Sequence, residues 1–391
     1  MKLKRIKNKR KWQGLKVILR VDFNIPRIGK KLGEDYRLLA SLPSINYLLD
    51  KGASIIIISH WGNPDGTDMN FSTKVLAKRL AKLSGHKIRF VPDLIGPKAK
   101  KAASALKPGE IIFLENLRFN PGEKKNDSNF AEGLADLADI YVNDAFSVCH
   151  REQASVSALS NLLPAFAGLQ LEQELKHLDK ASKPVKPLVL VMGGAKISTK
   201  APMIENLAGS ANKIIIGGAL ANNFLKYYKY EVGNSFYDEK SNSVIASLLK
   251  NKKIANKIVL PIDVIVKNYK GSPCRRLISD LKKTDTILDI GPDTIIIFSA
   301  LIRKAQTIIW NGPMGKFEEI HYKHGSLALA SVIAARSTGR AYGLVGGGET
   351  VSALKLTRME SHVDWVSTAG GAMLAYLGKE PMPGLKNLFV K

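Results

Sequence analysis

Short apolar runs alternate with longer segments of helical periodicity along the whole chain. The apolar runs cover residues 15–23, 54–60, 88–92, 111–114, 140–142, 188–192, 213–216, 258–261, 286–290, 307–310, 341–345 and 365–367. Between the first two runs, Leu38, Leu42, Ile45 and Leu49 recur at three- and four-residue spacing, as on one face of a helix. Strands that are apolar throughout and are separated by amphipathic helices predict parallel sheets with helices on both faces.

The chain length and these runs predict an α/β protein with two doubly wound parallel-sheet (Rossmann-like) domains, joined by a helix and hinge, with a cleft between them. A chain of 391 residues is too long for one ordinary hydrophobic core. A helical stripe of Leu171, Leu175 and Leu178, followed by the proline-containing segment 182–187, marks the connection. We therefore place a first domain at residues 1–165, the helix and linker at 166–186, a second domain at 187–372 and a C-terminal segment at 373–391.

Composition favours a folded protein with a lysine-rich surface. Hydrophobic residues make up 45% of the chain and charged residues 24%, and the formal net charge is +25. The lysines are spread over the whole sequence without a nucleic-acid-binding motif, so a solvated basic surface is the better interpretation than nucleic-acid binding. The two cysteines lack metal-binding spacing, and the basic start lacks the apolar segment of a signal peptide. We expect a cytoplasmic protein without a membrane span.

Glycine-rich turns follow the apolar runs of the second half. They read MGGAK, GGAL, DIGP, WNGPMG and GGGET, beginning at Met192, Gly217, Asp289, Trp310 and Gly346. Glycine after a strand lets backbone amides approach a phosphate closely, although a single glycine pair more often serves packing. The repetition favours a nucleotide site at the carboxyl ends of the strands.

Charged and amide side chains follow the apolar runs of the first half. The segments read RVDFN, SHWGN, LENLRF and NDAFSVCHR, beginning at Arg20, Ser59, Leu114 and Asn143. Arginine forks match phosphates and carboxylates, and a neutral histidine can still donate a hydrogen bond. Each of these residues taken singly is more often structural, but their placement at successive strand ends predicts a site for an anionic ligand.

Two further motifs carry charge suited to phosphate chemistry. In GGAKISTK, Lys196 and Lys200 follow a glycine turn and precede a helix that we expect to start near Ser198, where ammonium groups suit phosphate oxygens. In GGGET, the carboxylate of Glu349 suits Mg²⁺ carried by a nucleotide, although it equally suits a helix N-terminus.

The ordered motifs resemble those of the phosphoglycerate kinase family nearly from end to end. The segments that carry the resemblance are RVDFNIP, SHWGNP, LENLRF, VNDAF followed by HR, GGAKISTK, LPID, DIGP, WNGPMGKFE, GGGET and VSTAGGA. The resemblance implies reversible transfer of the acyl phosphate of 1,3-bisphosphoglycerate to MgADP, giving 3-phosphoglycerate and MgATP in glycolysis. It also implies a monomer with one domain for each substrate, closing about a hinge, with Mg²⁺ entering as MgADP or MgATP.

The resemblance assigns roles residue by residue. The expected 3-phosphoglycerate-binding residues are Asp22, Asn24, Arg37, His60, Asn63, Arg118, His150 and Arg151. The expected nucleotide-binding residues are Gly194, Lys200, Gly218, Asn311, Glu318, Gly347, Gly348, Glu349 and Thr350, with Glu349 also the metal-binding residue. The residues expected to lie beside the phosphoryl group during its transfer are Lys196, Arg37, Gly370 and Gly371.

Three positions depart from the family pattern. Asn63 stands where the family's SHLGRP has arginine, Glu349 stands where GGGDT has aspartate, and Ala369 stands where STGGGA has glycine. Ala369 raises the question whether its position needs a positive φ. These changes leave one alternative, a catalytically impaired nucleotide-binding protein of the same fold with a basic nucleic-acid-binding surface.

Overall fold

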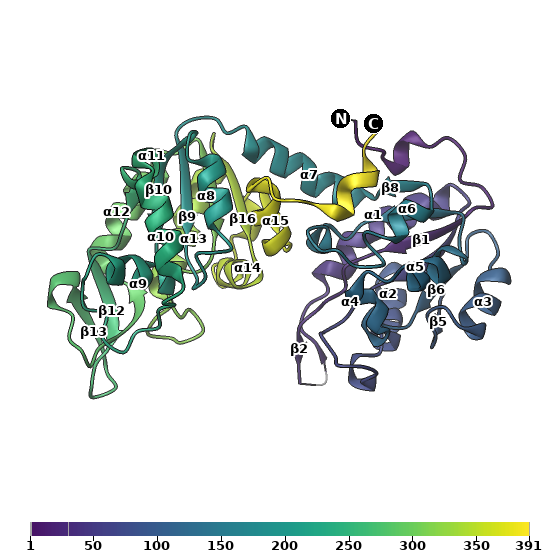
Figure 1. Cartoon of the computed structure of the whole chain (residues 1–391), viewed down its shortest axis with the longest axis horizontal. Coiled ribbons are helices and arrows are strands. Elements are labelled where there is room, and N and C mark those ends of the chain that lie inside the picture. Colours follow the sequence, from purple (N-terminus) through teal and green to yellow (C-terminus); the bar gives the residue numbers. More distant parts are fainter. Residues whose placement is uncertain (1, 30, 391) are drawn as a thin grey trace. The chain divides into compact units, whose positions relative to one another are not determined.

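The computed structural model describes residues 2–29 and 31–390, which divide into two compact units. Unit 1 comprises the residues up to Lys176 together with the segment from Met382 onward, and unit 2 comprises His177–Pro381. Each unit contains a parallel sheet with helices on both faces, as the alternation of apolar runs and amphipathic segments predicts (Figure 1). Within the described ranges, no helix combines the length and the apolar character needed to cross a membrane.

The parallel sheet of unit 1 has the strand order β5-β6-β4-β1-β7-β8. Its strands are β1 (Lys16–Arg20), β4 (Ser54–Ile58), β5 (Ile88–Val91), β6 (Ile111–Leu114), β7 (Ile140–Asn143) and β8 (Ala165–Ala167), and β2 (Arg27–Ile28) pairs with β3 (Lys31–Leu32) in a hairpin. The helices are α1 (Tyr36–Asp50), α2 (Lys74–Ser84), α3 (Pro97–Ser104), α4 (Pro121–Lys125), α5 (Ser128–Ala135), α6 (Leu159–Leu162) and α7 (Leu169–Ser182), which continues into unit 2.

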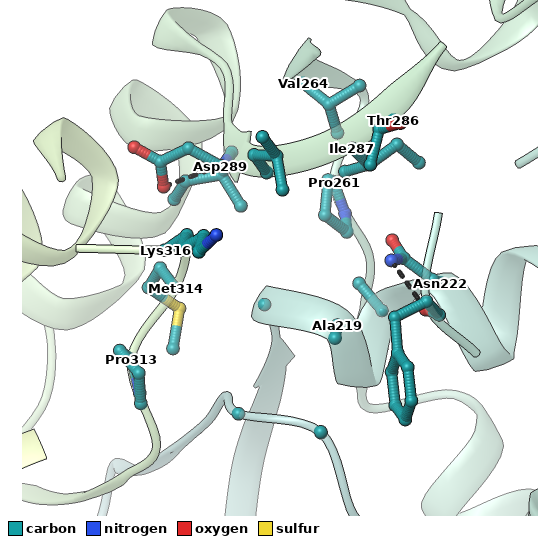
Figure 2. Close-up of a pocket in the computed structure, with 18 of the residues that line it drawn as sticks. Ala219, Asn222, Pro261, Val264, Thr286, Ile287, Asp289, Pro313, Met314 and Lys316 are labelled. Atoms are coloured by element: carbon teal, nitrogen blue, oxygen red, sulfur yellow. Dashed lines mark hydrogen bonds between the residues drawn. The ribbon is translucent and has the colours of Figure 1, made fainter. Parts of the chain in front are cut away.

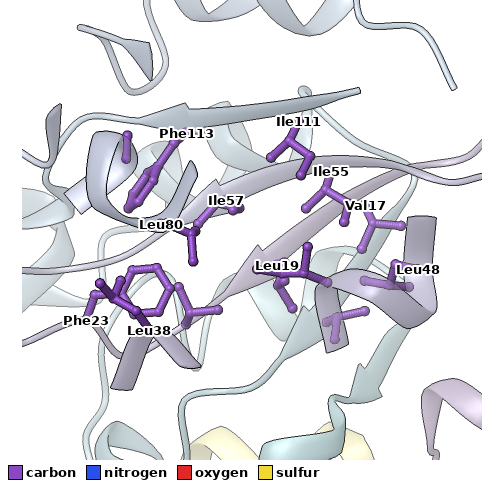
Figure 3. Close-up of a cluster of buried hydrophobic side chains, with 14 of the residues drawn as sticks. Val17, Leu19, Phe23, Leu38, Leu48, Ile55, Ile57, Leu80, Ile111 and Phe113 are labelled. Atoms are coloured by element: carbon purple, nitrogen blue, oxygen red, sulfur yellow. The ribbon is translucent and has the colours of Figure 1, made fainter. Parts of the chain in front are cut away.

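The core of unit 1 lies between one face of this sheet and helices α1 and α2 (Figure 3). Because side chains alternate along a strand, Val17 and Leu19 of β1 share a face with Ile55 and Ile57 of β4. Leu80 of α2 packs into the same fully buried cluster. The central strands are therefore packed on a buried core, and the loops that carry the predicted site residues leave their carboxyl ends.

The C-terminal segment completes unit 1. The backbone N–H of Lys4 donates to Leu388 O (2.7 Å), and the N–H of Val390 donates to Lys2 O (2.9 Å). The side-chain amide of Asn143, at the end of β7, donates to Gly384 O (3.1 Å) within the 3-10 helix η7 (Pro383–Leu388). These contacts tie the two ends of the chain to the same sheet.

The parallel sheet of unit 2 has the strand order β11-β10-β9-β15-β16-β17. Its strands are β9 (Leu188–Met192), β10 (Ala211–Ile216), β11 (Ile258–Val259), β15 (Thr307–Asn311), β16 (Tyr342–Gly346) and β17 (Trp365–Ser367). The helices are α8 (Ala201–Leu207), α9 (Gly218–Tyr227), α10 (Ser241–Lys250), α11 (Lys252–Ala255), α12 (Pro292–Arg303), α13 (His324–Ser337), α14 (Gly348–Lys355) and α15 (Gly370–Leu377).

Unit 2 also contains an antiparallel sheet, β13-β12-β14, that the sequence pattern did not predict. Its strands are β12 (Asp263–Lys267), β13 (Pro273–Leu277) and β14 (Thr286–Ile290). The apolar run at 286–290 is a strand, but its assignment to a parallel sheet was wrong. β13 has no apolar run because its residues are exposed or half-buried and include Arg275 and Arg276. β8 was also missed, since its residues merge with the helical pattern of α7.

Candidate functional site

The loops after the central strands of unit 1 gather the predicted anion-binding residues at one edge of its sheet. β1, β4 and β7 are parallel neighbours, so their carboxyl ends lie together. β1 leads to Asp22 and Asn24, β4 leads to His60 and Asn63, and β7 leads toward His150 and Arg151. Arg118 comes from the 3-10 helix η3 (Leu117–Phe119), which follows β6.

Asp22 organises the centre of this group. One carboxylate oxygen accepts hydrogen bonds from the Arg37 guanidinium and the Ser147 hydroxyl, and the other accepts from the backbone N–H of Asn24 (3.0 Å). Burial alone would raise the pKa of Asp22, but the charge of Arg37 and these hydrogen bonds hold it well below its usual value. The ionised carboxylate therefore fixes Arg37 on its helix. The sequence offered no specific signal for Ser147.

Asn24 and Arg118 both bind the loop that follows β4. The side-chain oxygen of Asn24 accepts from the backbone N–H of Gly62 (2.8 Å), and Arg118 donates to the Gly62 carbonyl. These contacts bring Asn24 and Arg118 to one loop, whereas Asn63, next along the chain, is exposed.

His60 is buried and electrically neutral. Burial lowers the pKa of its imidazole well below the usual value, and the nearby Arg20 guanidinium lowers it further. Nη2 of Arg20 lies 3.1 Å from Nδ1 of His60. Arg20 is the first residue of the RVDFN motif, but nothing in the sequence marked it as a site residue.

Arg151 lies close enough to Arg118 and to His150 to disfavour a positive charge on each of them. Burial lowers the pKa of Arg118 to about 10, and the positive charge of Arg151 contributes to the shift. Burial and Arg151 likewise lower the pKa of His150 to about 4. The guanidinium of Arg151 donates to Nε2 of His150 (3.3 Å), so this ring is also neutral at physiological pH. Guanidinium groups gathered in this way favour binding of an anion between them.

In unit 2 the glycine turns border a cavity of about 410 Å³, which falls within the roughly 300–1,000 Å³ typical of small-ligand pockets. Four of the predicted nucleotide-binding residues are among its lining residues: Gly194, Gly218, Glu318 and Glu349. Figure 2 shows Pro313, Met314 and Lys316 on one side and Asn222, Pro261 and Ile287 on the other. The cavity thus combines an apolar side with turns rich in backbone N–H groups.

Close backbone approach explains the glycines at two of these turns. Gly218 has φ +61°, and a Cβ there would lie 2.6 Å from the carbonyl oxygen of Pro313. Gly347 has φ +101°, and a Cβ on the neighbouring Gly370 would lie 2.6 Å from Gly347 Cα. The N-terminal ends of α14 and α15 consequently lie side by side, with Gly370 and Gly371 at the start of α15.

Lys196 and Lys200 lie in the turn before α8. That helix begins at Ala201, so the expected start near Ser198 was wrong; Pro202 in its first turn favours the later start. Lys200 is buried, with Nζ 3.4 Å from the Lys196 carbonyl oxygen, and burial lowers its pKa although Glu349 attracts the charge. The side chain of Lys196 is exposed.

The buried side chains of Asn311 and Thr350 form hydrogen bonds with the backbone of the glycine turns that follow β15 and β16. The amide of Asn311 donates to Gly346 O (2.7 Å), and the hydroxyl of Thr350 accepts from the N–H of Gly312 (2.7 Å). Both side chains are buried and neither lines the cavity. Their predicted contact with a nucleotide stays a prediction, as do the contacts of Gly347 and Gly348.

Asp289, at the end of β14, lines the cavity and anchors two segments. Its carboxylate accepts from the N–H groups of Gly325 (2.8 Å) and Ile290 (2.9 Å). Burial raises its pKa to about 7 despite these hydrogen bonds. The sequence predicted Asp289 only as part of the DIGP turn, with no role of its own.

The carboxylates of the described part of the chain do not form a metal centre of their own. Among residues 2–29 and 31–390, no group of three or more histidine, cysteine, aspartate or glutamate side chains is placed to hold a metal ion. Glu349 is exposed, lines the cavity and lies in the first turn of helix α14. One carboxylate beside this cavity fits Mg²⁺ that arrives on nucleotide phosphates, because such an ion needs only one or two protein carboxylates.

Ala369 has φ −97°, so this position does not require glycine. The side chain is buried at the start of α15. The substitution of the family's glycine is therefore accommodated without backbone strain.

Comparison with known proteins covers nearly the whole chain. Residues 7–380 match the family model described as phosphoglycerate kinase. Phosphoglycerate kinases of Wolbachia pipientis subsp. Culex pipiens and Geotalea uraniireducens are 41% and 39% identical to this chain, and each alignment covers 95% of both sequences.

Solved structures agree with the sequence comparison. Phosphoglycerate kinase from Coxiella burnetii is 34% identical, with a TM-score of 0.84, covering 99% of each chain. The enzyme from Pyrococcus horikoshii is 29% identical with the same TM-score, covering 99% of this chain and 98% of the other. The architecture of two parallel-sheet α/β units is thus shared with these structures.

Proposed function

Because the chain belongs to the phosphoglycerate kinase family and catalyses its reaction, we propose that unit 1 binds the sugar acid and unit 2 the nucleotide. The reaction is the reversible transfer of the acyl phosphate of 1,3-bisphosphoglycerate to ADP, a step of glycolysis. Neither the fold nor the relatives support the impaired, nucleic-acid-binding alternative.

One observation carries the assignment of unit 1: Arg118 and Arg151 lie close enough that the charge of one disfavours the charge of the other. A bound phosphate or carboxylate relieves this repulsion and accepts guanidinium hydrogen bonds. Arg37, oriented by Asp22, adds a third guanidinium. Neutral His60, His150 and the amides of Asn24 and Asn63 are suited to donate to the hydroxyl and carboxylate oxygens of 3-phosphoglycerate.

The cavity of unit 2 suits ADP and ATP. Its apolar side, with Pro261, Val264 and Ile287, is suited to a base, and exposed Glu318 is placed to accept from ribose hydroxyls. The turns at Gly194, Gly218 and Gly347–348, together with buried Lys200, supply N–H groups and positive charge for phosphates.

Phosphoryl transfer needs alignment and compensation of charge more than a covalent nucleophile. We assign the compensating groups as Lys196 and Arg37, with the backbone N–H groups of Gly370 and Gly371 at the helix start. Mg²⁺ bound with the nucleotide, held by Glu349, supplies further neutralisation of the phosphate charge. The same proposal includes a monomer that acts in the cytoplasm.

Isothermal titration calorimetry with each ligand tests whether unit 1 binds 3-phosphoglycerate and unit 2 binds the nucleotide. Arg118→Gln should weaken 3-phosphoglycerate binding by roughly 10- to 100-fold, since hydrogen bonds to charged groups contribute about 1.5–3 kcal/mol. It should leave MgADP binding unchanged. Arg89→Gln is the matched control, because Arg89 on edge strand β5 also donates to a backbone carbonyl, that of Ala102. Equal losses in both variants, or a loss of MgADP affinity in Arg118→Gln, would contradict the assignment.

A further inference from the structure

Arg20 is an arginine with no exposed surface at the end of the central strand β1. Its Nε donates to Oγ of Ser155 (2.9 Å) and its Nη1 donates to the Val21 carbonyl (2.6 Å). Its Nη2 lies 3.1 Å from Nδ1 of His60. Each of the three guanidinium nitrogens thus has a hydrogen-bond partner, and one of these partners, His60, is a predicted substrate-binding residue.

The charge of Arg20 is balanced by a carboxylate that is equally buried. Oε1 of Glu123 lies 4.0 Å from Nη2 of Arg20, and neither side chain is exposed. Ser155 joins the two, because its hydroxyl accepts from Arg20 and donates to Glu123 (2.7 Å) while its N–H donates to the other carboxylate oxygen (2.9 Å). A buried ion pair with this many hydrogen bonds holds both side chains in one arrangement.

The contact with Arg20 determines which nitrogen of His60 carries the proton. A guanidinium has only N–H donors, so Nδ1 of His60 must be the acceptor. The neutral ring then carries its proton on Nε2. The other charged groups near the ring are Asp22, Arg118 and Arg37, and Glu123 is paired with Arg20.

We infer that Arg20 is a positioning residue that holds His60 in the neutral Nε2–H tautomer, as a permanent hydrogen-bond donor to an oxygen of the bound sugar acid. Without Arg20, the ring is free to exchange tautomers or to gain a second proton within the physiological range. The role of His60 toward substrate rests on the proposed function of unit 1. The tautomer assignment rests only on Arg20 and His60.

Long-range ¹H–¹⁵N spectra of the imidazoles test the tautomer directly, with His60→Gln identifying the His60 signals. The wild-type protein should show an unprotonated Nδ1 and a protonated Nε2 from pH 8 down to about 5.5. A His60 with its proton on Nδ1, or one that titrates near its ordinary pKa of about 6.5, would overturn the inference.

A paired variant separates positioning from folding. Arg20→Met alone leaves the Glu123 charge buried and unpaired, so Arg20→Met/Glu123→Gln removes both charges. In this double variant we expect mixed tautomers or titration of His60, and a roughly tenfold higher KM for 3-phosphoglycerate that varies with pH. The kcat should change much less. Ser155→Ala, which loosens the ion pair but spares the contact with His60, is the control and should keep the wild-type His60 signals.

The two readouts distinguish the inference from the function on which it depends. Unchanged His60 signals in the folded double variant would refute the positioning role. Altered signals with an unchanged KM would retain the tautomer assignment and refute the placement of His60 at the substrate.

Discussion

Replacement of Asp22 by asparagine removes one charge from the centre of the unit 1 site at nearly constant volume. Asp22 is 11% exposed and its partner Arg37 is 16% exposed. The substitution keeps an oxygen for the N–H of Asn24 but presents an amide N–H₂ to Arg37 and Ser147, which are donors. Two charge-assisted contacts are lost, and Arg37 loses one of the two carboxylates, Asp22 and Glu34, that lie against its guanidinium.

The expected cost is about 2–3 kcal/mol in the free energy of unfolding of unit 1. Hydrogen bonds to charged groups contribute roughly 1.5–3 kcal/mol each, and partial exposure of both side chains reduces their sum. Because Arg37 also serves the proposed transfer, we expect the KM for 3-phosphoglycerate to rise by roughly tenfold or more and kcat to fall.

The sign of the pH dependence provides a second test. The pKa of Asp22 is lower in the folded protein than the value of about 3.9 for an unfolded chain, so the unfolded state binds more protons in acid. The stabilisation by Asp22 is therefore complete above about pH 5 and is lost as the pH falls below 4. The difference in unfolding free energy between wild type and Asp22→Asn should be about 1 kcal/mol smaller at pH 3 than at pH 7.

Urea unfolding followed by hydrogen exchange in peptides from β1 and β4 measures this difference for unit 1 alone. Asp65→Asn is the control, because Asp65 is an exposed aspartate of the same unit. A destabilisation below about 0.5 kcal/mol at pH 7, or one that does not change with pH, would refute the reasoning about Asp22.

Three other substitutions test different parts of the structure. Lys196→Ala should lower turnover in a coupled assay by roughly 10²–10³ without changing the melting temperature, because its side chain is exposed; near wild-type turnover would refute its role in transfer. Because burial raises the folded-state pKa of Asp289 to about 7, the wild type should lose up to about 4 kcal/mol of stability as the pH rises from about 4 to about 7. Asp289→Asn should not show this loss. Identical pH profiles of the two proteins in urea unfolding would contradict the prediction. Ile57→Ala, which opens a cavity in the fully buried core of unit 1, should cost about 2–5 kcal/mol there and leave MgADP affinity intact, as titration calorimetry would show.

The strand and helix pattern was predictable because parallel strands covered on both faces have continuous apolar runs. β1, β4, β6 and β9 are each buried along nearly their whole length, and their runs stand out in the sequence. β13 did not stand out in the sequence, because it is an edge strand that pairs only with β12 and its side chains are exposed or half-buried. Pairing of β14 with β12 depends on long-range contacts that an apolar run does not encode.

The site was predictable as a set of strand ends, but the way its members are held was not. Parallel neighbours bring Asp22, His60 and Arg151 to one edge of the sheet, which follows from topology. The contact between Arg20 and His60 requires knowledge of side-chain direction across two strands. Likewise, the sequence pattern could not show that Asn311 and Thr350 bind backbone groups in the turns.

Hydrogen exchange with each ligand in turn tests most directly whether the two units bind different substrates. The account predicts that 3-phosphoglycerate slows exchange around residues 20–26, 59–64 and 147–151 of unit 1. It predicts that MgADP slows exchange around residues 193–200, 217–222 and 346–350 of unit 2. Protection of unit 2 by 3-phosphoglycerate alone, or of the unit 1 segments by MgADP alone, would contradict the assignment of both sites.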